Sequence, residues 1–201
     1  VLSEEGSKKV PNTRAYWVVD PLDGTTNFAA GIPYWAISVA RFVDGRPSEV
    51  FLDVPALNQR FVALRGRGAT RNNQPLTSET RALATSACVS LCSRSIRVLQ
   101  RKPDQRFPGK IRLLGVASLN LVSVAMGQTI ASLEATPKIW DLAAAWLVLD
   151  ELGCPIRWLD ADPARLTPGE DVADLGFPML AAGSWAHLAR FLPWVEALVQ
   201  L

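Results

Sequence analysis

Two carboxylates stand three residues apart in the segment Asp20-Pro21-Leu22-Asp23-Gly24-Thr25-Thr26-Asn27-Phe28. The segment follows the apolar run Tyr16–Val19, which predicts a β-strand that delivers both carboxylates to its carboxyl end. Proteins with alternating strands and helices place their chemistry at such strand ends. Paired carboxylates repel one another unless a proton or a cation lies between them, and oxygen ligands of this kind suit Mg²⁺ or Mn²⁺. The glycine and the two threonines that follow can turn backbone N–H groups and hydroxyls toward a phosphate.

A polar turn is the structural alternative for this segment, because Asp, Pro and Gly are ordinary turn residues. Other candidate residues have similar alternatives. Asp141 can serve as a helix N-cap without any metal. Glu134 can be a charge at the rim of a pocket, and Glu4 a solvated acid near the chain end.

The longer segment Trp17–Phe28 resembles the first signature of the inositol monophosphatase family. Leu2–Glu5 is similar to the family's upstream Gly-Glu-Glu element, with Ser3 in place of the glycine. Ile139–Ala145 is similar to the second signature, in which Trp-Asp precedes small residues. Weaker matches in the same order are Arg67-Gly68-Ala69, Asn73, Pro75-Leu76, Gly115-Val116-Ala117 and Glu134. The resemblance runs from Leu2 to about Ser184 and covers nearly the whole chain.

This resemblance implies the layered αβαβα sandwich of the sugar phosphatases, an α/β (α+β) fold, here without its N-terminal helical pair. Val1 is not an initiator methionine, so we expect the native polypeptide to extend upstream and to cover one face of the sheet. The Pro-rich stretch 103–108 is the best candidate for a seam. It predicts an N-terminal half, residues 1–107, with the first signature, and a C-terminal half, residues 108–201, with the Trp-Asp signature. We expect the two halves to form one structural unit.

The resemblance also assigns roles to residues of the site. It implies a Mg²⁺ site, with Mn²⁺ as a substitute, held by Glu4, Asp20, the Leu22 carbonyl, Asp23 and Asp141. The catalytic residues would be Glu4, Thr25 and Asp23, with Thr25 and Glu4 orienting the attacking water. Phosphate and substrate would be bound by Gly24, Thr25, Thr26, Gly115, Val116, Ala117 and Glu134. We therefore expect the carboxylates of Asp20, Asp23 and Asp141 to converge within the radius of one metal site.

The implied reaction is hydrolysis of inositol monophosphate, or of a related sugar or polyol phosphate, by metal-activated water. Thr25-Thr26-Asn27 is more similar to the inositol phosphatase branch than to the bisphosphate nucleotidase branch. Val116 and Ile130 stand where polar residues are common, so histidinol phosphate, fructose bisphosphate and nucleotide phosphates remain alternatives. A non-catalytic relative that binds metal or phosphate, or acts as a subunit, is the alternative of another class.

Composition agrees with an enzyme domain. The chain has 201 residues, of which 49% are hydrophobic, and this length allows a sizeable core. A net charge of +2 gives no sign of an electrostatic nucleic-acid binder, and no apolar run reaches membrane-spanning length. Three cysteines without zinc-site spacing favour thiols in a reducing cytoplasm. His187 is the only histidine, which removes histidine-based catalytic triads, and the family resemblance suggests a homodimer.

Hydrophobic patterns predict strands separated by helices. Strands are expected at residues 16–19, 35–43, 49–54, 60–64, 69–72, 87–91, 110–114, 131–134, 155–158 and 179–182. Helices are expected at residues 93–100, 118–126, 141–152 and 184–200.

Overall fold

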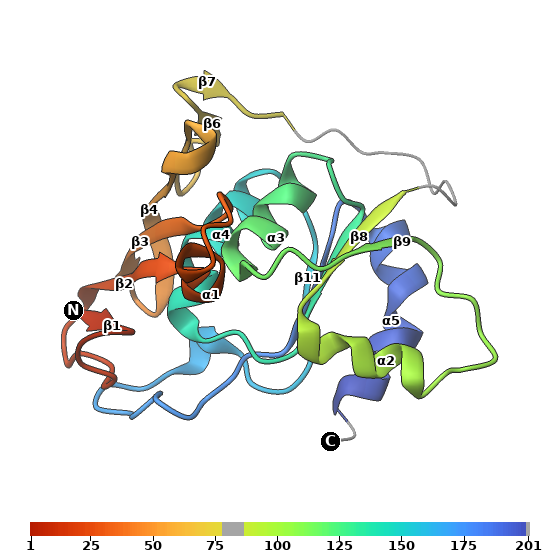
Figure 1. The fold of residues 1–201 in the computed structure, drawn as a ribbon. Coiled ribbons are helices and arrows are strands. Elements are labelled where there is room, and N and C mark those ends of the chain that lie inside the picture. Colours follow the sequence, from red (N-terminus) through yellow and green to blue (C-terminus); the bar gives the residue numbers. More distant parts are fainter. Residues whose placement is uncertain (78–86, 200–201) are drawn as a thin grey trace.

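The computed structural model describes residues 1–77 and 87–199, which form two β-sheets and the helices that cover them (Figure 1). The first sheet has seven strands in the order β1-β2-β3-β4-β5-β6-β7. Their bounds are β1 (Leu2–Ser3), β2 (Ala15–Asp23), β3 (Ala36–Val43), β4 (Arg46–Val54), β5 (Gln59–Leu64), β6 (Ala69–Arg71) and β7 (Gln74–Pro75). β1 runs parallel to β2, and every later pair in this sheet is antiparallel. Short hairpin turns join most of these strands.

The second sheet has five strands in the order β11-β12-β10-β8-β9. Their bounds are β8 (Cys88–Leu91), β9 (Lys110–Arg112), β10 (Ala131–Glu134), β11 (Ile156–Trp158) and β12 (Met179–Ala182). β8 pairs in parallel with both β9 and β10, whereas β12 is antiparallel to β10 and β11. The sheet is therefore mixed.

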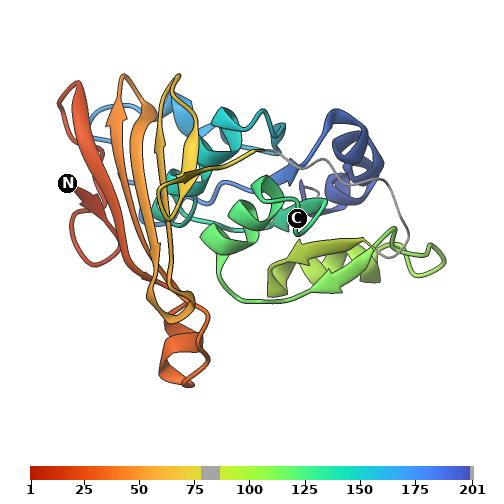
Figure 2. The ribbon, with the colours of Figure 1, turned by 90° about the horizontal axis from the view of Figure 1, so that it is seen from above.

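Helices separate the two sheets and cover the second one (Figure 2). α3 (Ala117–Ala125) and α4 (Ile139–Glu151) lie between the sheets, and α4 packs against β2, β3, β4 and β5. α2 (Arg97–Gln100) and α5 (Trp185–Val199) lie on the far side of the second sheet. The remaining helices are α1 (Thr25–Ala29) and the 3₁₀ turns at Pro55–Leu57, Ser93–Ile96 and Pro163–Arg165. The layered α/β sandwich predicted from the sequence is confirmed.

Side-chain burial follows from this layering. β3 alternates between buried and half-buried residues, so that one face meets α4 while the other looks outward. α4 is buried along almost its whole length because a sheet or a helix lies on each of its sides. One hydrophobic core fills the space between the first sheet and α3 and α4. A second core lies between the second sheet and α5.

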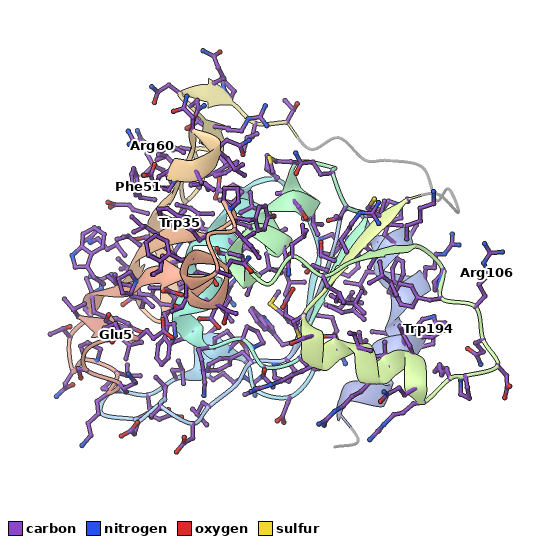
Figure 3. The ribbon with its side chains drawn as sticks, viewed as in Figure 1. Glu5, Trp35, Phe51, Arg60, Arg106 and Trp194 are labelled. Atoms are coloured by element: carbon purple, nitrogen blue, oxygen red, sulfur yellow. The ribbon has the colours of Figure 1, made fainter. Side chains whose placement is uncertain are left out.

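The outward face of the first sheet carries apolar side chains that reach solvent. Trp17, Phe51 and Leu64 are 44%, 36% and 40% exposed. The Arg60 guanidinium lies 5.1 Å from the centre of the Phe51 ring, and both side chains stand on the same outer surface (Figure 3). Coverage of this face by upstream residues stays a prediction.

Most predicted elements match the observed ones within a few residues, although β7 was not predicted and three predicted elements differ more clearly. β2 continues through Asp23, four residues beyond the predicted end of the strand at residue 19, and its pairing with β3 is irregular between Asp20 and Asp23. The predicted helix 93–100 is a 3₁₀ turn followed by the single turn of α2. The predicted strand 110–114 ends at Arg112. The seam at residues 103–108 lies between α2 and β9, and the division into halves at residue 107 stays a prediction.

Within residues 1–77 and 87–199, the structure shows no helix with both the length and the apolar character needed to cross a membrane.

Candidate active site

β2 carries the two carboxylates of the first signature at its carboxyl end. The register of β2 against β3 shifts between Asp20 and Asp23, which places both side chains on the buried side. Asp20 Oδ1 accepts the Leu22 N–H at 2.9 Å, and this bond keeps the irregular turn of the strand in place. Both carboxylates are at least nine-tenths buried.

Gly24 joins β2 to the short helix α1. Its φ of 95° lies in the left-handed region that favours glycine, and a Cβ there would stand 2.7 Å from Val116 Cγ2. The Thr25 hydroxyl donates to the Leu22 carbonyl at 3.0 Å, which ties α1 back to the strand. Asn27 Nδ2 donates to the carbonyls of Tyr34 and Leu114, at 2.9 and 2.8 Å. The first signature is thereby fixed to the segment that leads into Gly115.

Two further acidic residues arrive from distant parts of the chain. Glu4 follows β1, and its N–H donates to the Val19 carbonyl of the neighbouring strand at 3.2 Å. Asp141 lies in the first turn of α4, where its Oδ2 accepts the Lys138 N–H at 2.8 Å. Lys138, not Asp141, is the N-cap residue, so the reading of Asp141 as an N-cap is wrong. Its position in the first turn is nevertheless favourable for a carboxylate.

These segments enclose a pocket of about 230 Å³. Nine residues line it, and each of them is a predicted site residue: Glu4, Asp20, Leu22, Asp23, Gly24, Thr25, Thr26, Gly115 and Asp141. The pocket therefore gathers the two acidic signatures and the glycine-threonine segment in one place.

The carboxylates do not form a ready-made cluster within this pocket. In the described part of the chain, no three Asp, Glu, His or Cys side chains are grouped closely enough to hold a metal ion. Asp20, Asp23 and Asp141 line the same pocket, and their convergence within one metal-site radius stays a prediction. Each carboxylate accepts a different backbone N–H through one of its two oxygens, from Leu22, Ser118 and Lys138 respectively.

Burial and mutual repulsion disfavour the charged form of these groups. Burial raises the pKa of Asp23 to about 6, although the hydrogen bond from the Ser118 N–H favours the charged carboxylate and lowers the pKa. Burial and the nearby charge of Asp23 raise the pKa of Asp141 to about 7. The same two causes, in the same order, raise the pKa of Asp20 to about 9. The three buried carboxyl groups in this small pocket thus need either protons or a cation.

The chemistry of the donor set fits a divalent cation. Four carboxyl groups and the Leu22 carbonyl are hard oxygen donors, which Mg²⁺ and Mn²⁺ prefer. No Lys or Arg is among the described residues that line this pocket, although the charge of Lys138 lies near Asp141 and favours its charged form. Asp20, Asp23 and Asp141 would have to turn toward a bound ion from their present backbone partners.

A second pocket of about 290 Å³ adjoins the first and shares Asp23, Gly115 and Asp141 with it. Its lining includes the remaining predicted substrate residues, Val116, Ala117 and Glu134. Glu134 is only 1% exposed, so its reading as a rim charge is wrong. Its buried position raises the pKa of the carboxyl group to about 8, although hydrogen bonds from Asn120 and Ser132 favour the charged form.

Sequence reasoning missed several residues that hold the site together. Ser118, Asn120 and Ser132 donate hydrogen bonds to Asp23 or Glu134. Ser132 was within reach of prediction, because residues two apart on a strand share a face and Glu134 is two residues further on. Asn120 is a polar residue inside an apolar helix, and that contrast was the available signal.

Comparison with known proteins places this geometry in a family. The model of the inositol monophosphatase family matches residues 1–193. The chain belongs to the inositol monophosphatase family.

Relatives within the inositol monophosphatase family carry different names. The chain is 33% identical over 183 residues to the Nus factor SuhB of Xylella fastidiosa, with 80% of this chain and 62% of that protein covered. It is 34% identical over 170 residues to the histidinol-phosphatase of Mycobacterium tuberculosis, with 80% and 65% covered. The chain thus spans somewhat less than two thirds of the length of these relatives. The crystal structure of an IMPase/NADP phosphatase complexed with Mg²⁺ and phosphate superposes with a TM-score of 0.78 at 26% identity, covering 98% of this chain and 72% of that one.

Membership of the inositol monophosphatase family supports the view that the protein is a phosphatase. The relatives and the similar structure differ in the substrates that their names give, so family membership alone leaves the substrate open.

Proposed function

We propose that the protein is a Mg²⁺-dependent phosphomonoesterase that hydrolyses inositol monophosphate or a related small sugar or polyol phosphate. The observation that carries the proposal is the single pocket lined by Glu4, Asp20, Asp23 and Asp141 together with the glycine-threonine segment. The similar IMPase/NADP phosphatase structure with Mg²⁺ and phosphate supports the same chemistry. Mn²⁺ would substitute for Mg²⁺.

The residues that line the first pocket would have different roles in the reaction. Glu4, Asp20, Asp23, Asp141 and the Leu22 carbonyl would hold the metal, which when bound supplies charge neutralisation and a more acidic water. Glu4 and Thr25 would orient the attacking water, with the Thr25 hydroxyl fixed by the Leu22 carbonyl.

Gly24, Thr25 and Thr26 would donate to the phosphoryl oxygens from the exposed start of α1. The leaving group would then occupy the second pocket against Glu134 and the backbone of Gly115, Val116 and Ala117. This arrangement lets the first pocket stabilise the phosphate while the second one selects the alcohol.

Two alternatives remain within the proposal. Histidinol phosphate is supported as a substrate by the histidinol-phosphatase relative, while fructose bisphosphate and nucleotide phosphates would need cationic partners for a second phosphate. A non-catalytic role is favoured by the relative named as a Nus factor. We further propose that the protein is a cytoplasmic homodimer. Its ligand would be a small phosphate ester, and it would bind neither nucleic acid nor a membrane.

A panel of phosphate esters separates these possibilities. Phosphate release is measured from inositol 1-phosphate, histidinol phosphate and fructose bisphosphate, each with Mg²⁺ and with EDTA. The proposal expects release that requires Mg²⁺ and is greatest for a monophosphate. Undiminished release in EDTA would contradict the metal mechanism, and no release from any ester would favour the non-catalytic alternative.

A further inference from the structure

Within residues 1–77 and 87–199, the side chains that hold the carboxyl group of Glu134 both donate to the same oxygen, Oε1. Asn120 Nδ2 donates to its Oε1 at 2.9 Å, and Ser132 Oγ donates to the same oxygen at 3.0 Å. Both donors are buried, as is Glu134 itself. Because both donors go to Oε1, Oε2 is the oxygen that remains for a molecule in the second pocket.

Asn120 is itself part of that pocket. It lies on α3 with 1% of its surface exposed, and it lines the same cavity as Glu134. Its Nδ2 serves as the donor to Oε1 of Glu134, so its Oδ1 is left to find another donor. Asn120 Oδ1 has no hydrogen-bond partner in the described structure, although buried polar atoms are rarely left unpaired. The Asn120 amide thus keeps its hydrogen bond to Glu134 while its Oδ1 makes none in the described structure.

The backbone around Asn120 is fixed from both directions. Its N–H donates to the Val116 carbonyl at 2.9 Å, and its carbonyl accepts the Ser123 hydroxyl at 2.6 Å. Ser123 also contacts the Thr129 hydroxyl at 2.7 Å. The polar network therefore leaves the Asn120 amide little freedom to move away from Glu134.

We propose that Asn120 is a positioning residue for substrate selection. By holding Oε1 of Glu134, it directs the other carboxyl oxygen toward the leaving group as a hydrogen-bond acceptor. The described lining of this pocket contains three carboxyl groups and no Lys or Arg. The pocket therefore selects phosphate esters whose alcohol brings hydroxyl donors, and it disfavours a second phosphate. This inference rests on the proposed function.

Two esters separate this role from a purely structural one. The alcohol of inositol 1-phosphate carries several hydroxyls, whereas the leaving group of p-nitrophenyl phosphate carries none. We expect Asn120→Leu to raise KM for inositol 1-phosphate about tenfold or more, because a site built to bind a hydroxyl loses selectivity when its acceptor is misplaced. The effect on kcat, and on both constants for p-nitrophenyl phosphate, is expected to stay within about threefold.

A double variant tests whether Asn120 acts through Glu134. Asn120→Leu combined with Glu134→Gln is expected to be no worse than Glu134→Gln alone, since the two residues work as a unit. Ser132→Ala removes the other donor to Oε1 and is expected to change KM in the same direction. Thr129→Val is the matched control, because Thr129 belongs to the same buried network but makes no bond to Glu134.

The outcomes are distinguishable. Equal losses for the two esters, or additive losses in the double variant, would overturn the role of Asn120. If Asn120→Leu does not fold, as judged by thermal unfolding, the smaller Asn120→Ser variant is measured with the same expectations. Wild-type protein that hydrolyses neither these two esters nor any ester of the panel with Mg²⁺ would overturn the proposed function, and this inference with it.

Discussion

Asp23 and Ser118 are joined by a hydrogen bond although 95 residues separate them in the chain. Asp23 Oδ2 accepts the Ser118 N–H at 2.8 Å, at the first turn of α3. The first sheet and the helix layer are thereby connected at the candidate active site. The partial positive charge at the start of a helix favours a carboxylate there, which partly offsets the cost of burying Asp23.

Removing one carboxylate tests the proposed metal site. We expect Asp20→Asn to lower Mg²⁺-dependent turnover by ~10²-fold or more, since it weakens both metal binding and electrostatic stabilisation of the transition state. Initial rates of phosphate release over a Mg²⁺ titration give the measurement. Asp53→Asn is the control, because this acid pairs with Arg60 on the outer face of the first sheet. Equal turnover in the two variants would contradict the assignment.

The buried carboxyl groups also predict how stability depends on pH without metal. Asp23 and Asp141 have an ordinary pKa of 3.8 that rises to about 6 and about 7 in the folded protein. The native state therefore binds more protons than the unfolded state between these values, and stability falls as pH rises from about 4 to about 7. For these two groups the loss is complete above about pH 7, and Glu134 and Asp20, whose pKa values are raised to about 8 and about 9, extend the loss to about pH 9. Added Mg²⁺ is expected to stabilise the protein more at alkaline than at acidic pH, because metal ligands must be deprotonated.

Thermal unfolding in EDTA checks this dependence. Asp23→Asn keeps an oxygen acceptor for the Ser118 N–H but carries no charge. At alkaline pH we expect its Tm to exceed that of the wild type by about 2–4 °C, the shift that ~1 kcal/mol produces in a domain of this size. At acidic pH the difference should disappear. A Tm difference of the same size at every pH would show that titration of Asp23 is not its cause.

Local patterns predicted much of the fold because they depend on near neighbours. The alternation in β3 and the apolar helix α4 are both visible in the sequence, and the residues that line the first pocket were identified from their motifs, whereas Cys92, Ser93, Thr136 and Pro137 of the second pocket were not. The irregular pairing between Asp20 and Asp23 depends on the neighbouring strand, so the sequence predicted a strand that ends at residue 19. Tertiary packing decides such details.

The orientation of side chains could not be predicted from the sequence, because it also depends on tertiary packing. The partners of Asp23 and Glu134 include Ser118 and Asn120 on α3, and no sequence period relates this helix to either acid. The carboxylates accept separate backbone N–H groups, which only the packed structure reveals. The chemical roles of these residues stay predictions.

The Thr25 hydroxyl offers a conservative test of the water-orienting role. It donates to the Leu22 carbonyl at 3.0 Å, so Thr25→Ser keeps the hydroxyl while Thr25→Val replaces it with a methyl group of similar size. We expect kcat to fall ~10²-fold in the valine variant and less than about tenfold in the serine variant, as for a general acid–base contribution. Parallel losses of kcat in both variants would indicate a packing role instead.

Gly24 lets the chain turn tightly from β2 into α1, and its replacement tests whether that geometry matters for activity. Its φ is 95°, and an added Cβ would lie 2.7 Å from Val116 Cγ2. We expect Gly24→Ala to lower kcat/KM by about tenfold or more, because a displacement of about 1 Å in a catalytic segment is costly. Steady-state rates with inositol 1-phosphate and Mg²⁺ give the measurement.

Two further variants separate the steric clash at Gly24 from backbone strain. Gly169 also has a positive φ, 83°, but a Cβ there would meet no atom within 4 Å. Gly169→Ala therefore carries the strain of a left-handed alanine without the clash, and we expect lower stability with unchanged kcat/KM. Adding Val116→Ala to Gly24→Ala removes the clashing methyl groups and should recover part of the lost activity. A double variant as inactive as Gly24→Ala alone would assign the whole effect to the backbone of the turn, because only the left-handed φ is then left to impair it.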